Sequence, residues 1–324
     1  MGGTDHQAGQ SGVTPTITVT EAHVVAFAAI TGDYSFGHMD RHAMERSPYG
    51  ERVAHGLLGA GLAVGMLSHW AAHVVGRGTG WLSEFVCNYR QPLKLGNTIR
   101  IAWRIVQVSS GEPHGRVKSA FDVLDQRDEP VFDGTISVAV GEELRPVSTP
   151  KVPWSVAASE PDPARTYYVE DLKPGQGGET SGRTMTEADV VNYAGLVGDL
   201  DPRYVDAEAA RSGSVGARIA PPMLVFSVAF GLWHRRWSRY RSPDLGLAGH
   251  LNDGVTVCAP VAIGDTIRAR YQVLSTRLSR SRPGVGLEVW GLQVLNQRNE
   301  VVQEGSVLMM RPSAAGSPEA KIDG

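Results

Sequence analysis

The sequence predicts an α+β protein built from two copies of one unit, each a long buried helix followed by an antiparallel sheet. Three observations lead to this prediction: the chain repeats itself, each copy contains one long apolar helical segment, and alternating β-branched segments follow each helix. With 324 residues, the chain is long enough for two domains that each bury a core.

The repeat is clearest at the start of each copy, where TVTEAHVVAFAAITGDY, from Thr18, aligns with TMTEADVVNYAGLVGDL, from Thr184. The offset of 166 residues continues without a gap as far as Ala54 and Ala220. Later, PLKLGNTIR in the first copy matches PVAIGDTIR in the second, and LDQRDEP matches LNQRNEV. Both copies are therefore expected to have the same fold.

The order of elements follows from local patterns in the first copy. The T-x-T-E sequence before an apolar run predicts a helix over about 21–30 that stops at Gly32. An irregular stretch follows, and then apolar residues at helical spacing predict a second helix over 55–70. Its counterpart in the second copy is apolar almost all round, which indicates that other elements wrap it on most sides. TIRIAWRIVQV and GTISVAV are expected to form strands.

A Pro- and Ser-rich segment without periodicity predicts a linker over 145–166. The first domain is expected to span 13–144 and the second 167–312.

The composition excludes several classes of function. The chain has 42% hydrophobic and 20% charged residues and a net charge of −3, which is typical of a globular protein without a polyanionic partner. No basic segment leads into an apolar stretch at the start, and the longest apolar run, Met223 to Trp233, is shorter than the roughly 20 residues that a membrane span needs. Cys87 and Cys258 are expected to be buried reduced thiols. We therefore expect a cytoplasmic protein that binds neither nucleic acid nor membrane.

The most informative segment is GDYSFGHMDRHAMERSPYGERVAHGLL, from Gly32 to Leu58. It resembles the signature of MaoC-like (R)-specific enoyl-CoA hydratases and dehydratases, in which G-D-x-N-P-x-H-x-D precedes a Gly-rich turn and A-H-G-x-L. The G-D-T-I and N-Q elements also belong to this family, so the resemblance covers nearly the whole chain in two copies. It implies the hotdog fold in its fused, double hotdog form. It also implies trans-2-enoyl thioester substrates, on CoA or an acyl carrier protein, and no cofactor.

By this resemblance, Asp33 and His38 hold one water and add it to the C2–C3 double bond, while the amide of Gly56 polarises the thioester carbonyl. The chemistry is sound, because an Asp and a His can pass protons near neutral pH. An amide at a helix N-terminus is an unsatisfied donor suited to an oxyanion. Ser35 and Phe36 replace the Asn and Pro of the signature, and Ser35 is expected to replace the polar contact of the Asn in part.

The second copy keeps Asp199 but has Tyr204 at the His position and Pro221-Pro222 at the His-Gly position. A phenol titrates near pH 10, so it is a poor base at neutral pH. Proline has no N–H to donate to an oxyanion. We expect this half to be a structural partner that completes the pocket, and fused members of the family imply that it leaves room for bulky acyl chains.

Other patterns are expected to have ordinary roles. The Gly-rich HGLLGAGLAVG has Val64 where a dinucleotide-binding loop needs glycine. His23, His55, His69 and His73 show no clustering with carboxylates or cysteines, so we expect helix or cap histidines and no metal site.

The segment WHRRWSRYR contains four arginines interleaved with aromatic residues. A solvated helix end is one interpretation, and a site for the phosphates of CoA or of a carrier protein is the other. The candidates for that site are Arg235, Arg236, Arg239 and Arg241.

The function expected from these observations is reversible hydration of enoyl thioesters and dehydration of 3-hydroxyacyl thioesters. A hotdog thioesterase is one alternative, although the helix over 55–70 lacks the carboxylate that such enzymes generally carry. A non-catalytic acyl-binding or assembly subunit is another, motivated by the lost Asn and the altered second copy. The sequence leaves a homodimer open.

Overall fold

The computed structural model describes residues 7–75, 80–109, 115–140, 154, 157–158, 161–162, 164–240, 242 and 249–316. Its strands form one 13-stranded sheet in the order β1-β4-β5-β6-β3-β10-β13-β12-β11-β8-β7, with β2 on β4 and β9 on β11. The strands of the first half are β1 (Ser11–Val13), β2 (Ile17–Thr18), β3 (Gly80–Tyr89), β4 (Thr98–Ser109), β5 (Gly115–Leu124) and β6 (Pro130–Val140). The later strands are β7 (Ala157–Ala158), β8 (Gln176–Glu179), β9 (Arg183–Thr184), β10 (His250–Val257), β11 (Thr266–Leu278), β12 (Val285–Leu295) and β13 (Val301–Pro312).

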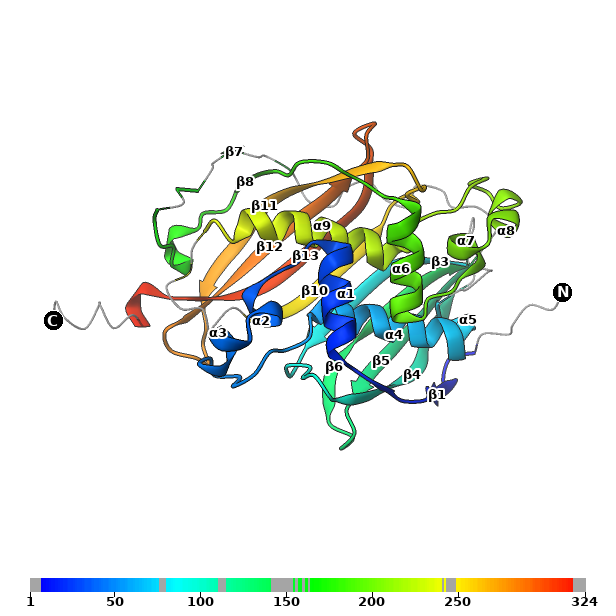
Figure 1. Ribbon diagram of the computed structural model, residues 1–324, viewed down its shortest axis with the longest axis horizontal. Helices are drawn as coiled ribbons and strands as arrows, with labels where there is room; N and C mark the ends of the chain where they lie inside the picture. Colours follow the sequence, from blue (N-terminus) through cyan, green and yellow to red (C-terminus); the bar gives the residue numbers. More distant parts are fainter. Residues whose placement is uncertain are drawn as a thin grey trace.

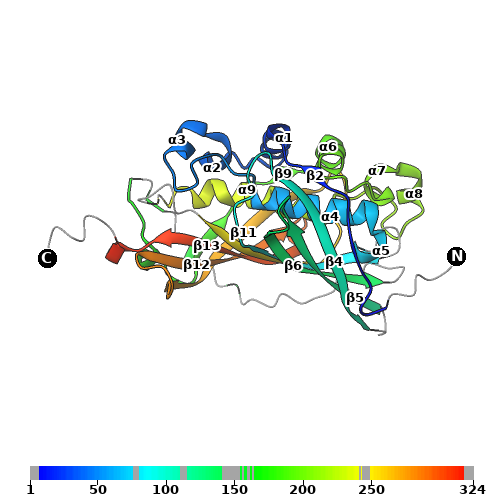
Figure 2. The same ribbon diagram turned by 90° about the horizontal axis from the view of Figure 1, so that it is seen from below.

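The helices lie together on one face of this sheet (Figures 1 and 2). In the first half they are α1 (Glu21–Thr31), α2 (Phe36–Met39), α3 (Arg41–Glu45), α4 (Gly56–Trp70) and α5 (Ala72–Val75). In the second half they are α6 (Glu187–Val197), α7 (Pro202–Val205), α8 (Ala207–Arg211) and α9 (Pro222–Trp237), with short 3-10 turns at Val169–Asp171 and Ala314–Gly316. Figure 2 shows α4 and α9 next to the sheet and α1 and α6 outside them.

The two halves meet at β3 and β10, which pair antiparallel in register from Asn88 with Asn252 to Glu84 with Thr256. On either side of this seam, each half contributes four long antiparallel strands and one long helix buried along most of its length. Two hotdog units therefore form one continuous sheet, a double hotdog, as the sequence predicts.

Each central helix packs against the end of the first helix of the other half. A Cβ built on Gly231 of α9 would lie 2.3 Å from the carbonyl oxygen of Thr31, and one built on Gly65 of α4 would lie 1.8 Å from that of Val197. Only glycine permits such an approach. The loop that follows α1 thus rests on the helix of the second half.

The predicted helix boundaries agree closely with the structure. The first helix ends at Gly32, whose φ of 78° is the left-handed C-cap that glycine favours, and Gly198 does the same in the second half. Cys87 and Cys258 are buried free thiols, as expected. No helix among the described residues has the length and apolar character that crossing a bilayer requires. Most of the linker predicted over 145–166 lies outside the described residues, so the domain boundaries stay predictions.

Candidate active site

A cavity of about 900 Å³ lies between the helices and the sheet, with walls from both halves. Its polar lining from the first half includes Asp33, Ser35, His38, His55 and Gly56. Its lining from the second half includes Phe230, His234, Arg235, Trp237 and His250. The structure therefore gathers the predicted catalytic residues in one cavity that the second half helps to close.

Asp33 follows the left-handed turn at Gly32 and is buried, with 5% of its surface exposed. Its backbone N–H donates to the hydroxyl of Thr31 at 3.3 Å, and its Oδ1 accepts the backbone N–H of Ser35 at 3.1 Å. These bonds fix the carboxylate at the start of the loop, and Ser35 contributes through its backbone.

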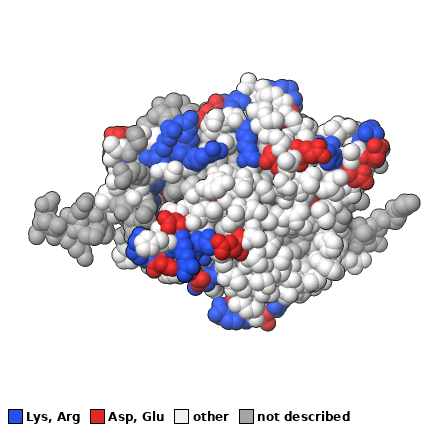
Figure 3. All heavy atoms as spheres, in the orientation of Figure 1, with Lys and Arg blue, Asp and Glu red and all other residues white. Residues whose placement is uncertain are grey.

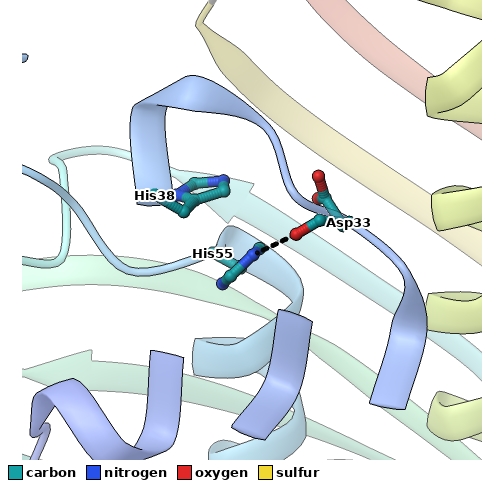
Figure 4. Close-up of side chains that lie close together, drawn as sticks. All are labelled: Asp33, His38 and His55. Carbon is teal, nitrogen blue, oxygen red and sulfur yellow. Dashed lines mark hydrogen bonds between the residues drawn. The ribbon is translucent and has the colours of Figure 1, made fainter. Parts of the chain in front are cut away.

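His38 and His55 lie side by side, with ring centroids 3.8 Å apart (Figure 4). The Nδ1 of His38 is 2.8 Å from the carbonyl oxygen of Val53, and the Nε2 of His55 is 2.9 Å from the carbonyl oxygen of Asp33. A carbonyl can only accept, so each of these ring nitrogens carries the proton. The lone pair of a neutral His38 is therefore on Nε2, where it can take a proton from a water.

The burial of His38 lowers its pKa from the ordinary 6.5 to about 3, and positive charge on His55 acts in the same direction. His38 is thus a neutral imidazole at neutral pH. Burial alone would raise the pKa of Asp33, but charge on the surrounding histidines, His234 foremost, lowers it below its ordinary range. The site therefore holds a carboxylate beside a neutral imidazole, a pair that can share one water.

Gly56 is the first residue of α4, so its amide has no carbonyl four residues earlier in the helix to bind. A Cβ built on it would lie 2.9 Å from the ring of Tyr89, so the position has no room for a side chain. The amide stands at the positive end of the helix dipole, as an oxyanion donor requires.

The expectation that His55 would not cluster with a carboxylate is wrong. Ligand atoms of Asp33, His38 and His55 lie within 4.8 Å of one another, because the loop after α1 folds back over the start of α4. This cluster fits a metal poorly, since the His55 nitrogen nearest Asp33 donates to a carbonyl and its other nitrogen is on the far side of the ring (Figure 4). His23, in contrast, caps α1 as expected, because its Nδ1 accepts the backbone N–H of Thr20 at 3.1 Å.

Side chains of the second half that the sequence does not single out also reach the cavity. The Nδ1 of His234 on α9 lies 3.8 Å from Oδ1 of Asp33. Tyr89 and His250 also line the cavity. Behind them, the fully buried Asp253 accepts a hydrogen bond from the hydroxyl of Tyr89 at 2.6 Å and pairs with Nε2 of His250 at 2.7 Å. This Tyr89–Asp253–His250 cluster joins the two halves, and the ring of Tyr89 lies against Gly56.

The four candidate arginines do not all reach the cavity. Arg235 lines it, whereas Arg236 and Arg239 are absent from its lining, and Arg241 lies outside the described residues. On the face seen in Figure 3, a hollow lies between Lys and Arg side chains over the C-terminal end of α9 and Lys and Arg side chains mixed with acidic ones near α3.

At the equivalent position in the second half, the residues that the structure describes offer neither the histidine nor the amide donor. Tyr204 is buried, and its burial together with the charge of Asp199 raises the pKa of its phenol well above 10. Next to it, Arg203 pairs with the buried Asp201 at 2.6 Å and lies 4.5 Å over the ring of Trp81. Pro222 begins α9 without an N–H.

Comparison with known proteins agrees with this geometry. Residues 5–123 and 171–287 each match the MaoC like domain. The chain belongs to the MaoC-like dehydratase family, a family of hydro-lyases.

Two relatives and two solved structures illustrate the match. A 3-hydroxybutyryl-CoA dehydratase of Methylorubrum extorquens is 31% identical over 132 residues, 40% of this chain and 80% of that one. An (R)-specific enoyl-CoA hydratase of Rhodospirillum rubrum is 34% identical over 110 residues, 33% of this chain and 69% of that one. A MaoC domain dehydratase from Chloroflexus aurantiacus superposes with a TM-score of 0.73 at 18% identity, covering 95% of this chain and 96% of that one. A Mycobacterium tuberculosis protein with a double hotdog fold gives 0.71 at 15% identity, covering 95% and 97%. These two structures support the fold alone.

Proposed function

We propose that this MaoC-like protein catalyses the reversible hydration of 2-enoyl thioesters to 3-hydroxyacyl thioesters on CoA or an acyl carrier protein. The observation that carries the proposal is the convergence of Asp33, His38 and the Gly56 amide on one cavity. The names of the relatives, a 3-hydroxybutyryl-CoA dehydratase and an (R)-specific enoyl-CoA hydratase, point to the same substrates.

In the proposed reaction, one water lies between the carboxylate of Asp33 and Nε2 of His38. His38 takes a proton from this water as its oxygen bonds to C3, and the electrons of the double bond move toward the thioester carbonyl. The Gly56 N–H stabilises the negative charge on the carbonyl oxygen. The same proton then passes to C2, so that the product contains all the atoms of the water and the enzyme returns to its starting state.

Within this proposal, Ser35 lies beside the water and Arg235 lies at the cavity wall, where its guanidinium can bind a phosphate of the carrier. Arg236, in the last turn of α9, and Arg239, just after the helix, continue the same charged segment and would act at longer range.

The test is to assay (E)-2-butenoyl, 2-octenoyl and branched 2-enoyl thioesters, on CoA and on acyl carrier protein, by loss of the conjugated enoyl absorbance. Asp33→Asn should lower kcat by about 10³-fold, with Tyr204→Phe as the matched control from the second half. Release of free thiol instead of hydration would favour a thioesterase. Binding of all thioesters without turnover of any would favour an acyl-binding subunit.

A further inference from the structure

The central helix of the second half brings one histidine to the catalytic carboxylate. Gly231 allows α9 to touch the backbone of Thr31 and Asp33, and His234 follows three residues later on the same side of the helix. Its Nδ1 lies 3.8 Å from Oδ1 of Asp33, and 16% of its side chain is exposed. The imidazole is therefore a fixed neighbour of Asp33 inside the cavity.

Aromatic contacts hold this imidazole in place. The ring of Phe230 stacks at 6.0 Å with an angle of 19° between the planes, and the ring of Trp237 lies at 5.1 Å. Trp237 is itself anchored, because its Nε1–H donates to the buried Glu288 at 2.7 Å. The position of His234 is thus set by the second half of the molecule.

The internal repeat allows α9 to be compared with α4, which makes the same helix packing against the half without an intact catalytic set. Gly231 corresponds to Gly65, and both glycines make the same close approach to the other half. His234 corresponds to Ser68, which is buried in α4. The packing therefore requires glycine in both helices. Three residues after that glycine, an imidazole is present only in α9, the helix that lies beside Asp33.

We infer that His234 is a positioning residue that holds the carboxylate of Asp33 for the hydration reaction. The second half, which lacks its own catalytic set, thereby supplies part of the working site. This inference rests on the proposed function.

The charges around His234 set the direction of its influence. Burial lowers the pKa of His234, the carboxylate of Asp33 raises it, and positive charge on His250 lowers it. In return, positive charge on His234 lowers the pKa of Asp33 and also that of His38, and His55 completes the group that faces it. Arg235, the adjacent cation on α9, also lines the cavity. Removing His234 should therefore raise the pH at which Asp33 and His38 take up protons.

The test compares His234→Gln with His69→Gln, which changes an exposed histidine in the last turn of the other central helix. With (E)-2-butenoyl-CoA, or whichever enoyl thioester the protein hydrates best, His234→Gln should lower kcat by about 10- to 100-fold, because small misplacements of catalytic groups have effects of this size. KM should stay nearly constant. In the dependence of kcat on pH, the fall on the acid side should shift to higher pH by about one unit, as expected when an opposite charge is removed from within about 4 Å of a carboxylate. His69→Gln should change none of these.

A second measurement does not depend on turnover. In protein with ¹³C-labelled aspartate carboxyl groups, with the Asp33 signal assigned through Asp33→Asn, His234→Gln should raise the pH at which Asp33 titrates. The reciprocal change, Asp33→Asn, should lower the pKa of the His234 imidazole, because the coupling is mutual. This second variant keeps the test valid if His234→Gln fails to fold.

A folded His234→Gln in which kcat falls on the acid side at an unchanged pH and Asp33 titrates unchanged would overturn the inference and leave His234 a packing residue. If the unaltered protein hydrates no enoyl thioester, the proposed function fails, and the titrations still decide whether His234 acts on Asp33.

Discussion

The two halves of this molecule have the same fold, but they carry different side chains in the loop that follows their first helix. Between α1 and α4, the first half places Asp33 and His38 on the wall of a cavity, with the Gly56 amide at the start of α4. After α6, the equivalent loop of the second half carries the buried phenol of Tyr204 and an Arg203–Asp201 ion pair. The hotdog scaffold therefore tolerates either an open site or a packed one at this place, and the local residues decide which.

The strongest test of this contrast is removal of the acid and base from the first half. Asp33→Asn and His38→Ala should each lower kcat by about 10³-fold, which is typical for the loss of general acid–base catalysis. Asp199→Asn and Tyr204→Phe, the matched changes in the second half, should leave kcat unchanged within the error of the assay. Equal losses from both pairs would show that the second half is catalytic.

The amide of Gly56, at the N-terminus of α4, provides the next test. Gly56→Ala should lower kcat by about 10²-fold, as for other losses of an oxyanion donor, because the new methyl group meets the ring of Tyr89 and displaces the amide. Gly195→Ala on α6, where an added Cβ meets nothing within 4 Å, is the control and should leave kcat unchanged. Steady-state kinetics with an enoyl thioester and a thermal melt of each variant provide the measurement. An active Gly56→Ala would remove this amide from the mechanism.

A smaller effect is expected from Arg235, which the second half contributes to the cavity wall. Arg235→Ala should raise KM for the carrier thioester by about 3- to 5-fold, because exposed charge pairs contribute little, and kcat should remain near that of the unaltered enzyme. The effect should disappear in high salt. Arg239→Ala, which changes an exposed arginine outside the cavity lining, is the control. Equal effects from the two variants would favour a diffuse charged surface over a phosphate site.

The last expected effect concerns stability in acid. A neutral His38 with a folded-state pKa near 3 contributes stability that is fully present above pH 6.5 and is lost as the pH falls toward 3, because the unfolded chain binds the proton more readily. His38→Gln should therefore reduce the fall in Tm between pH 6.5 and 4, and Tyr204→Phe should not. A steeper fall in His38→Gln would contradict the neutral imidazole.

The sequence predicts much of this arrangement because the decisive signals are local. The repeat, the apolar helices and the Asp33–His38–Gly56 spacing all lie within short segments, so the fold and the first-half site follow from pattern. His234, His250 and Asp253 carry no spacing signal, since they meet Asp33 and Tyr89 only when β10 pairs with β3 and α9 packs on α1.

Two further differences have particular causes. The sequence predicts a helix or cap role for His55, because the histidine shows no clustering with a carboxylate or cysteine along the chain. Only the fold of the preceding loop brings Asp33 to it. One signal for His234 was present in the sequence, because it is a histidine where the first copy has Ser68.

The pairing of β3 with β10 within one chain also has a genetic consequence. In a dimer of identical subunits, each codon change is copied to both symmetry-related sites, so a residue that helps one site is imposed on the other. When one reading frame encodes both units, a substitution in one unit leaves the other unit unchanged. In this chain the second half carries Tyr204 and Arg203 at its own loop and places His234 3.8 Å from the Asp33 carboxylate of the first half, a difference that two identical subunits could not have.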